Sequence, residues 1–354
     1  MNGFRRWDAS AEKIKFCVLA GLISLPSHSS AISFVFNDVT PGGMDPAALA
    51  GFQKAANIWE GLILDNIQVN LDIRFDNSDI SGNAFPAGVL GSAGSTTQGI
   101  SYTNVRGALI LDATTTADNT ATANLPAAPS LSFLTNDANT SAVVTDNNAS
   151  GNNNTLDVNT ANAKALGLRP ANDPATDAGI SFNNAFTWDF DQSDGVDPGH
   201  QDFVGVSVHE IGHALGFTSG VDVVDFTHGA GPGAPVVLDN FRVHTVLDLY
   251  RYSAPGQLNY ATGGNPYFSI DGGTTNLATF STGSFNGDGQ QASHWEDNLG
   301  IGIFDPTANP PGNINEISAL DLLSLDVVGY DVVPEPSAFL LSLIGLGFTL
   351  RRRR

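Results

Sequence analysis

The sequence predicts an α+β fold with a twisted mixed sheet, a central helix, a loop-rich C-terminal part and a closing helix. Residues 32–75 have a strand, helix, strand pattern, which is typical of a sheet with a crossover helix. Residues 203–216 carry apolar side chains at helical spacing and end in a glycine, a common helix C-terminus. Glycine and proline recur through residues 218–293, and residues 317–332 have the pattern of an amphipathic helix.

The N-terminal elements follow from short patterns. Residues 32–38, ISFVFND, are apolar with partial alternation, which favours a strand. Asp45 suits an N-cap and Pro46 suits the first helical position, so a helix is predicted to begin there. Residues 67–75, IQVNLDIRF, alternate and predict a second strand.

The middle of the chain is predicted from weaker patterns. A third strand is expected at 106–113, RGALILDA. Residues 114–160 are rich in Thr, Asn, Asp and Ala, and long surface loops with one strand in TSAVV are expected there. A short helix is expected at 158–168, and a strand followed by a turn at 178–191.

Composition excludes one class of partner. The chain has 354 residues, with 36 acidic and 15 basic side chains. A nucleic-acid-binding face needs clustered Lys and Arg, so no nucleic-acid partner is expected. The acidic balance fits an exported, soluble protein.

Residues 1–31 have the pattern of a signal peptide. Lysines precede a short apolar stretch at 16–25, and small residues surround Ala31, where cleavage is expected. The only cysteine, Cys17, lies in this segment. The mature chain is therefore expected to have no disulfide.

Residues 333–354 have three consecutive parts, which are Pro334-Glu335-Pro336, an apolar stretch at 338–350 and four terminal arginines. A buried helix fits the arginines poorly. The tail resembles the PEP-CTERM sorting signal of Gram-negative bacteria. The resemblance implies an exosortase-type sorting enzyme as partner and transient membrane contact through the tail as a short transmembrane helix. It also implies release to the cell surface or extracellular matrix after the tail is removed.

The sequence HEIGH contains the H-E-x-x-H motif. His209 and His213 are spaced i and i+4, so a helix places both imidazoles on one face, where they can share a zinc ion. Glu210 then lies beside the open position of that ion, where it can act as the catalytic base toward a water held there.

A third protein ligand is expected at a catalytic zinc site. The spacing H-E-x-x-H-x-x-G-x-x-H/D, found in metzincins, places Ser219 at the third position, and serine is a poor zinc ligand. The remaining candidates are Asp222, Asp225, His228, His244, Glu296 and His294.

His294 is favoured by a resemblance. The segments HEIGHALGF and QQASHWEDNLGIGIFDP resemble leishmanolysin-like metalloproteases, whose third histidine lies in an SHW segment far downstream. The resemblance implies a metzincin-like zincin fold over residues 32–332, with subdomains 32–217 and 218–332. It also implies a Zn²⁺ endopeptidase in which His209, His213 and His294 bind the metal.

Two departures from this family stand out. Phe304 occupies the position where metzincins have the methionine of the Met-turn, so altered packing under the metal is expected without loss of the metal. The disulfides of the eukaryotic relatives are also absent.

Four aspartates in one loop could hold Ca²⁺ through their carboxylates, although a solvated polar loop is the favoured interpretation. These residues are Asp189, Asp191, Asp194 and Asp197.

The sequence therefore predicts a secreted zinc metalloendopeptidase that acts on a protein or peptide substrate. The segment GISFN at 179–183 is a candidate edge strand for pairing with that substrate. Two alternatives stay open, which are a non-catalytic surface- or matrix-binding protein on a zincin scaffold and a zinc amidase acting on cell-wall peptides.

Overall fold

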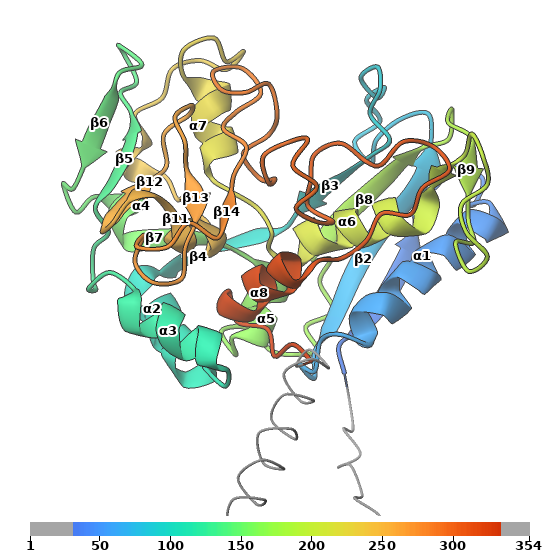
Figure 1. The fold of residues 1–354 in the computed structure, drawn as a ribbon, viewed down its shortest axis with the longest axis horizontal. Coiled ribbons are helices and arrows are strands. Elements are labelled where there is room, and N and C mark those ends of the chain that lie inside the picture. Colours follow the sequence, from blue (N-terminus) through green and yellow to red (C-terminus); the bar gives the residue numbers. More distant parts are fainter. Residues whose placement is uncertain (1–30, 334–354) are drawn as a thin grey trace, which may run out of the picture.

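A computed structural model describes residues 31–333, which form an α+β fold with several sheets (Figure 1). The expected signal peptide at 1–31 and the expected sorting tail at 333–354 lie outside the described residues, apart from one residue at each boundary. Within 31–333, no helix has the length and apolar character needed to cross a bilayer.

The main sheet is mixed, as predicted. Its order is β1-β2-β8-β3, in which β1 (Ser33–Asp38), β2 (Gln68–Asp76) and β8 (Ala178–Asn183) are parallel. Strand β3 (Gly91–Ser95) pairs antiparallel with β8 and forms one edge. The expectation that residues 179–183 form an edge strand was wrong, because β8 has a partner on both sides.

Two helices lie side by side against the main sheet, α1 (Pro46–Glu60) and α6 (Phe203–Leu215) (Figure 1). Helix α1 begins as predicted, because the Asp45 carboxylate accepts a hydrogen bond from the N–H of the second helical residue. The helices approach closely at Gly51, where a Cβ atom would lie 2.5 Å from the Phe203 ring. Glycine at this position lets α6 sit deep in the core.

A second sheet combines strands from distant parts of the chain. Its order is β14-β13-β11-β12-β5-β6, and β12 (Gln257–Asn259) runs parallel to β5 (Phe133–Asn136). The other members are β6 (Val143–Asp146), β11 (Arg251–Ala254), β13 (Tyr267–Phe268) and β14 (Ala278–Thr279). Strands from before and after residue 217 therefore share one sheet, and buried apolar residues from both parts form one continuous core.

The strand expected at residues 106–113 was wrong, because this segment is helical. Helix α2 spans Tyr102–Asp112, and the Ser101 side chain caps its N-terminus. Its buried apolar residues include Val105, Ala108 and Leu109, which recur at helical spacing. This helical spacing of buried residues is short, but it describes the segment better than the apolar run that suggested a strand.

The prediction of long loops at 114–160 was also largely wrong, although the strand expected in TSAVV overlaps β6. The segment folds into α3 (Thr116–Asn124), β5, β6, α4 (Gly151–Asn154) and β7 (Thr155–Asn159), with β7 paired to β4 (Thr97–Ser101). Its polar residues stabilise regular structure because they are hydrogen-bonded. For example, the buried Asn153 amide donates to the Leu131 carbonyl over 3.1 Å.

The remaining elements complete the described fold. They are β9 (Trp188–Asp189), β10 (Gln201–Asp202), α5 (Thr160–Ala165), α7 (Val221–Thr227), two short 3₁₀ helices (Leu238–Asn240 and Leu247–Tyr250) and the closing helix α8 (Ala319–Val327). Helix α8 is shorter than the predicted span. Just beyond it, Tyr330 donates a hydrogen bond of 2.7 Å to the Leu215 carbonyl at the C-terminal end of α6.

Carboxylates gather where α2, α3 and α8 meet. Burial and neighbouring carboxylates raise the pKa of Asp112 to about 7. Burial likewise raises the pKa of Asp326 to about 7, although a hydrogen bond from Thr115 opposes the shift. None of the ion pairs in the described residues involves this group.

This cluster predicts that stability falls as pH rises from about 4 to 7.5. Because the folded pKa values of Asp112 and Asp326 lie above the unfolded values, the native state binds more protons in this window. Asp112→Asn/Asp326→Asn should therefore raise the unfolding free energy at pH 7.5 and flatten its pH dependence. The expected rise is roughly 1–3 kcal/mol, less than the full pKa shifts would give, because water partly screens these carboxylates. Thermal unfolding between pH 4 and 8 measures this. Asp38→Asn is the control, because hydrogen bonds lower the pKa of Asp38 despite an opposing burial effect.

Candidate metal centre

Helix α6 presents the H-E-x-x-H motif at its C-terminal half. Its start is defined by Asp202, whose carboxylate accepts a hydrogen bond of 2.9 Å from the Gly205 N–H. Its end is defined by Gly216, whose φ of 124° favours glycine. His209 and His213 lie one turn apart on one face, as the spacing predicted.

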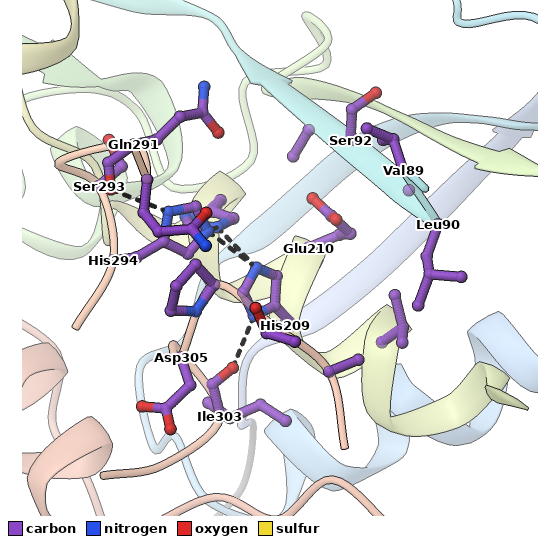
Figure 2. A pocket seen from close by; sticks show the side chains of 18 of the residues that line it. Val89, Leu90, Ser92, His209, Glu210, Gln291, Ser293, His294, Ile303 and Asp305 are labelled. Atoms are coloured by element: carbon purple, nitrogen blue, oxygen red, sulfur yellow. Dashed lines mark hydrogen bonds between the residues drawn. The ribbon is translucent and has the colours of Figure 1, made fainter. Parts of the chain in front are cut away.

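Three imidazoles converge at one point. The distances between Nε2 atoms are 2.9 Å for His209–His213, 3.2 Å for His213–His294 and 3.3 Å for His209–His294. Among the described residues, these three histidines are the one group of ionisable side chains placed closely enough to hold a metal. Figure 2 shows His209 and His294 pointing toward each other.

The second ring nitrogen of each histidine faces a backbone carbonyl. His209 Nδ1 lies 2.6 Å from the Ile303 oxygen, and His213 Nδ1 lies 2.6 Å from the Phe217 oxygen. His294 Nδ1 lies 3.2 Å from the Gln291 oxygen. Since a carbonyl only accepts, each Nδ1 carries the proton and each Nε2 presents a lone pair.

This arrangement fits a metal ion. Three unprotonated Nε2 lone pairs facing one another repel unless a cation lies between them. Nitrogens that bind a tetrahedral zinc at about 2.0–2.1 Å lie roughly 3.3 Å apart, close to the distances here. Burial also lowers the histidine pKa values, that of His213 to about 3, which favours the neutral ligating form.

Glu210 lies beside this group, between the His209 ring and strand β3 (Figure 2). A Cβ atom added at Gly91 of β3 would lie 3.2 Å from the Glu210 Oε1 atom, so glycine gives the carboxylate room. Burial raises the pKa of Glu210 to about 8. A cation bound by the three imidazoles would favour the ionised carboxylate and lower this pKa.

Phe304, at the position where metzincins have a methionine, forms the apolar floor of the centre. The buried ring packs 3.8 Å from the Phe217 ring, in a stacked arrangement. A Cβ atom at Gly212 would lie 2.2 Å from the Phe304 ring. The helix therefore needs glycine at position 212, because the larger phenylalanine occupies the space beneath it.

A large cleft opens over the three histidines. Its volume is about 1590 Å³, more than the roughly 300–1,000 Å³ typical of small-molecule sites. Its walls come from β3 and the preceding loop, from α7 and from residues 300–318. Among residues 31–333, no Lys or Arg lines it, whereas its acidic lining residues are Asp79, Asp157, Glu210, Asp222, Asp305 and Glu316.

The other candidate ligands lie elsewhere. Asp222 lines the cleft, but its carboxylate accepts hydrogen bonds from Ala292 and Ser293. His228 Nδ1 faces the Val224 carbonyl at 3.0 Å.

Three further candidates, and Ser219 at the metzincin position, also lie outside the group of histidines. Asp225 accepts hydrogen bonds from the backbone of Phe285 and Asn286. His244 is fully buried between the rings of Phe133 and Tyr260. Glu296 is exposed, and Ser219 donates to a buried carboxylate in place of binding metal.

The aspartate loop at 189–197 does not form a metal-binding group. Asp189 uses both oxygens to accept from the backbone N–H groups of Asp191 and Asp197. Asp191 pairs with Lys54 at 3.0 Å. No three of these carboxylates converge in the described structure, so the calcium prediction is not supported and the solvated loop remains the better interpretation.

Sequence reasoning missed the groups that orient the imidazoles. All three, the carbonyls of Ile303, Phe217 and Gln291, belong to the backbone and leave no sequence signal. It also missed strand β3, whose sequence GSAGS lacks the apolar alternation typical of strands. Comparisons with protein-family models, curated proteins and solved structures gave no significant match to this chain.

Proposed function

We propose that this protein is a secreted zinc endopeptidase. The observation that carries the proposal is the convergence of three Nε2 lone pairs from His209, His213 and His294 beside the buried Glu210 carboxylate. Three protein ligands with an open fourth position are typical of catalytic zinc sites, whereas structural sites have four. A neighbouring carboxylate supplies the base that a hydrolase needs.

The arrangement around the centre supports a metzincin-like zincin fold. A mixed sheet lies above the metal helix, and its antiparallel edge strand β3 lines the cleft. An aromatic floor lies beneath the histidines. The size of the cleft favours a polypeptide, and an extended substrate could pair with the free edge of β3 through main-chain hydrogen bonds.

The chain's own residues divide the chemistry between them. Zinc bound at the three Nε2 atoms would supply a Lewis acid that lowers the pKa of water and polarises a peptide carbonyl. Glu210 takes the proton from the attacking water and delivers it to the leaving amine. The backbone carbonyls that face each Nδ1 hold the imidazoles in the ligating tautomer.

Export and sorting remain part of the proposal and rest on the sequence of the terminal segments. The expected signal peptide and the expected PEP-CTERM tail place the mature domain outside the cell, with an exosortase-type enzyme as sorting partner. The acidic cleft lining is consistent with the exclusion of nucleic acid as a substrate.

The purified full chain tests the proposal. We expect about one zinc per chain and cleavage of an unfolded protein and of members of a broad peptide library. Removing the metal with a chelator should abolish cleavage, and adding zinc should restore it. Metal analysis and mass spectrometry of the products measure both.

Other outcomes would select the alternatives. Stoichiometric zinc without any peptide cleavage would favour a non-catalytic binding protein. Turnover of peptidoglycan fragments without protein cleavage would favour a cell-wall amidase. A chain that binds no metal would contradict the proposal altogether.

A further inference from the structure

One segment of the chain, residues 291–305, serves the metal centre in three ways. It carries His294, it provides the Ile303 carbonyl that faces His209 Nδ1, and it places Phe304 under the histidines. Its two ends are joined because the Trp295 N–H donates to the Phe304 carbonyl over 3.0 Å. The position of this segment therefore sets the geometry of two imidazoles.

An aspartate in α7 holds the first end of this segment. The Asp222 Oδ1 atom accepts a hydrogen bond of 2.7 Å from the Ala292 N–H, and its Oδ2 atom accepts one from the Ser293 hydroxyl. The Ser293 oxygen in turn accepts from the Ser219 N–H at 2.8 Å. The residues just before His294 are thereby tied to the chain that leaves α6.

An aspartate in α8 holds the other part. Asp321 is fully buried, and its Oδ1 atom accepts a hydrogen bond of 2.8 Å from the Trp295 indole N–H. Its Oδ2 atom accepts one of 2.8 Å from the Ile303 N–H and one of 2.6 Å from the Ser318 N–H. A single carboxylate thus holds the neighbour of His294 and the residue whose carbonyl faces His209.

We propose that Asp222 and Asp321 are positioning residues that clamp the 291–305 segment and so set the directions of the His294 and His209 Nε2 lone pairs. The proposal rests on the proposed zinc binding. Asp222 was a candidate ligand by sequence, and its contacts assign it to the support of a ligand instead. The physical reason is that His294 lies outside any helix or strand, so its position depends on packing and on hydrogen bonds to neighbouring segments.

Zinc affinity of Asp222→Ala and Asp321→Asn tests this role, measured by competition with a chromophoric chelator. Losing the partners that orient a metal ligand typically costs about 10–100-fold in affinity, and we expect a loss of that size. The visible absorption of the cobalt-substituted protein should also change, because it reports ligand geometry. Asp326→Asn is the matched control, since Asp326 is a buried aspartate of α8 that does not contact the segment.

A second variant covers the case in which Asp321→Asn fails to fold. Trp295→Phe removes the indole donor to Asp321, together with part of a buried ring, but keeps the Asp321 carboxylate, and it should weaken zinc binding in the same direction. Thermal unfolding of the metal-free proteins distinguishes a positioning role from a purely structural one. A purely structural role would lower the unfolding temperature and leave the zinc affinity and the cobalt spectrum unchanged.

The outcomes distinguish the two proposals. Folded Asp222→Ala and Trp295→Phe variants that bind zinc as tightly as the wild type, with its cobalt spectrum, would overturn the clamp. A control as strongly affected as Asp321→Asn would overturn it too. A wild type that binds zinc but cleaves nothing would defeat the peptidase proposal alone, because the affinity comparison still decides the role of the two aspartates.

Discussion

Replacing His294 by alanine is expected to abolish stoichiometric zinc binding. The two remaining imidazoles, on α6, cannot close a site that needs three protein ligands. The loss should exceed the roughly 10–100-fold that follows from disturbing an orienting partner. Added zinc should raise the unfolding temperature of the wild type, because it binds the native state, and should not raise that of the variant.

The control for this result is His228→Ala, which removes a buried histidine outside the centre. It should retain about one zinc per chain and the zinc-dependent rise in unfolding temperature. Full zinc content in His294→Ala together with loss in His228→Ala would show that the third ligand is wrongly identified.

Replacing Glu210 by glutamine is expected to lower the rate of peptide cleavage by about 10²–10⁴-fold while zinc stays bound. Glutamine has nearly the same shape, so the packing against β3 is kept, but its amide cannot accept the proton of the attacking water. Steady-state cleavage of a peptide substrate and metal analysis of the same preparation measure the two effects separately.

Glu296→Gln is the matched control, because Glu296 is an exposed glutamate two residues from His294. It should keep both the metal and the activity. A Glu210→Gln protein that cleaves peptides at the wild-type rate would rule out Glu210 as the base, whatever its metal content.

The motif in α6 could be recognised from sequence because its meaning is local. Helical geometry alone places residues i and i+4 on one face, and Gly216 ends the helix immediately afterwards. The same is true of the start of α1, where Asp45 and Pro46 act within one turn. Contacts of this range leave a pattern in consecutive residues.

Predictions from local sequence patterns failed where packing and hydrogen bonds with other segments determine the structure. The apolar run at 106–113 suggested a strand, but helix α2 buries Val105, Ala108 and Leu109 on one side. The polar run at 114–160 suggested loops, yet residues such as Asn153 are buried and hydrogen-bonded to distant backbone. Polarity predicts exposure only when no partner for the polar group lies inside.

The third ligand could be narrowed to a few candidates from the sequence but was identified only in the structure. Spacing alone left six candidates, and only a family resemblance favoured His294. In the structure its Nε2 lies 3.2 Å from that of His213, although 81 positions separate them. Folding of the 291–305 segment brings the two histidines together, and no periodic pattern in the sequence indicates this contact.

The sequence by itself determined the helix with its two histidines and glutamate and the strands β1 and β2. It also determined the acidic composition, on which the expectation of no nucleic-acid partner rests. Only the tertiary structure showed which candidate ligand lies beside the two imidazoles of α6 and which strand is the edge beside the cleft. It also explained why position 212 is glycine. The physical reason is that the first group depends on neighbours within a turn or a strand. The second depends on packing between segments far apart in the chain.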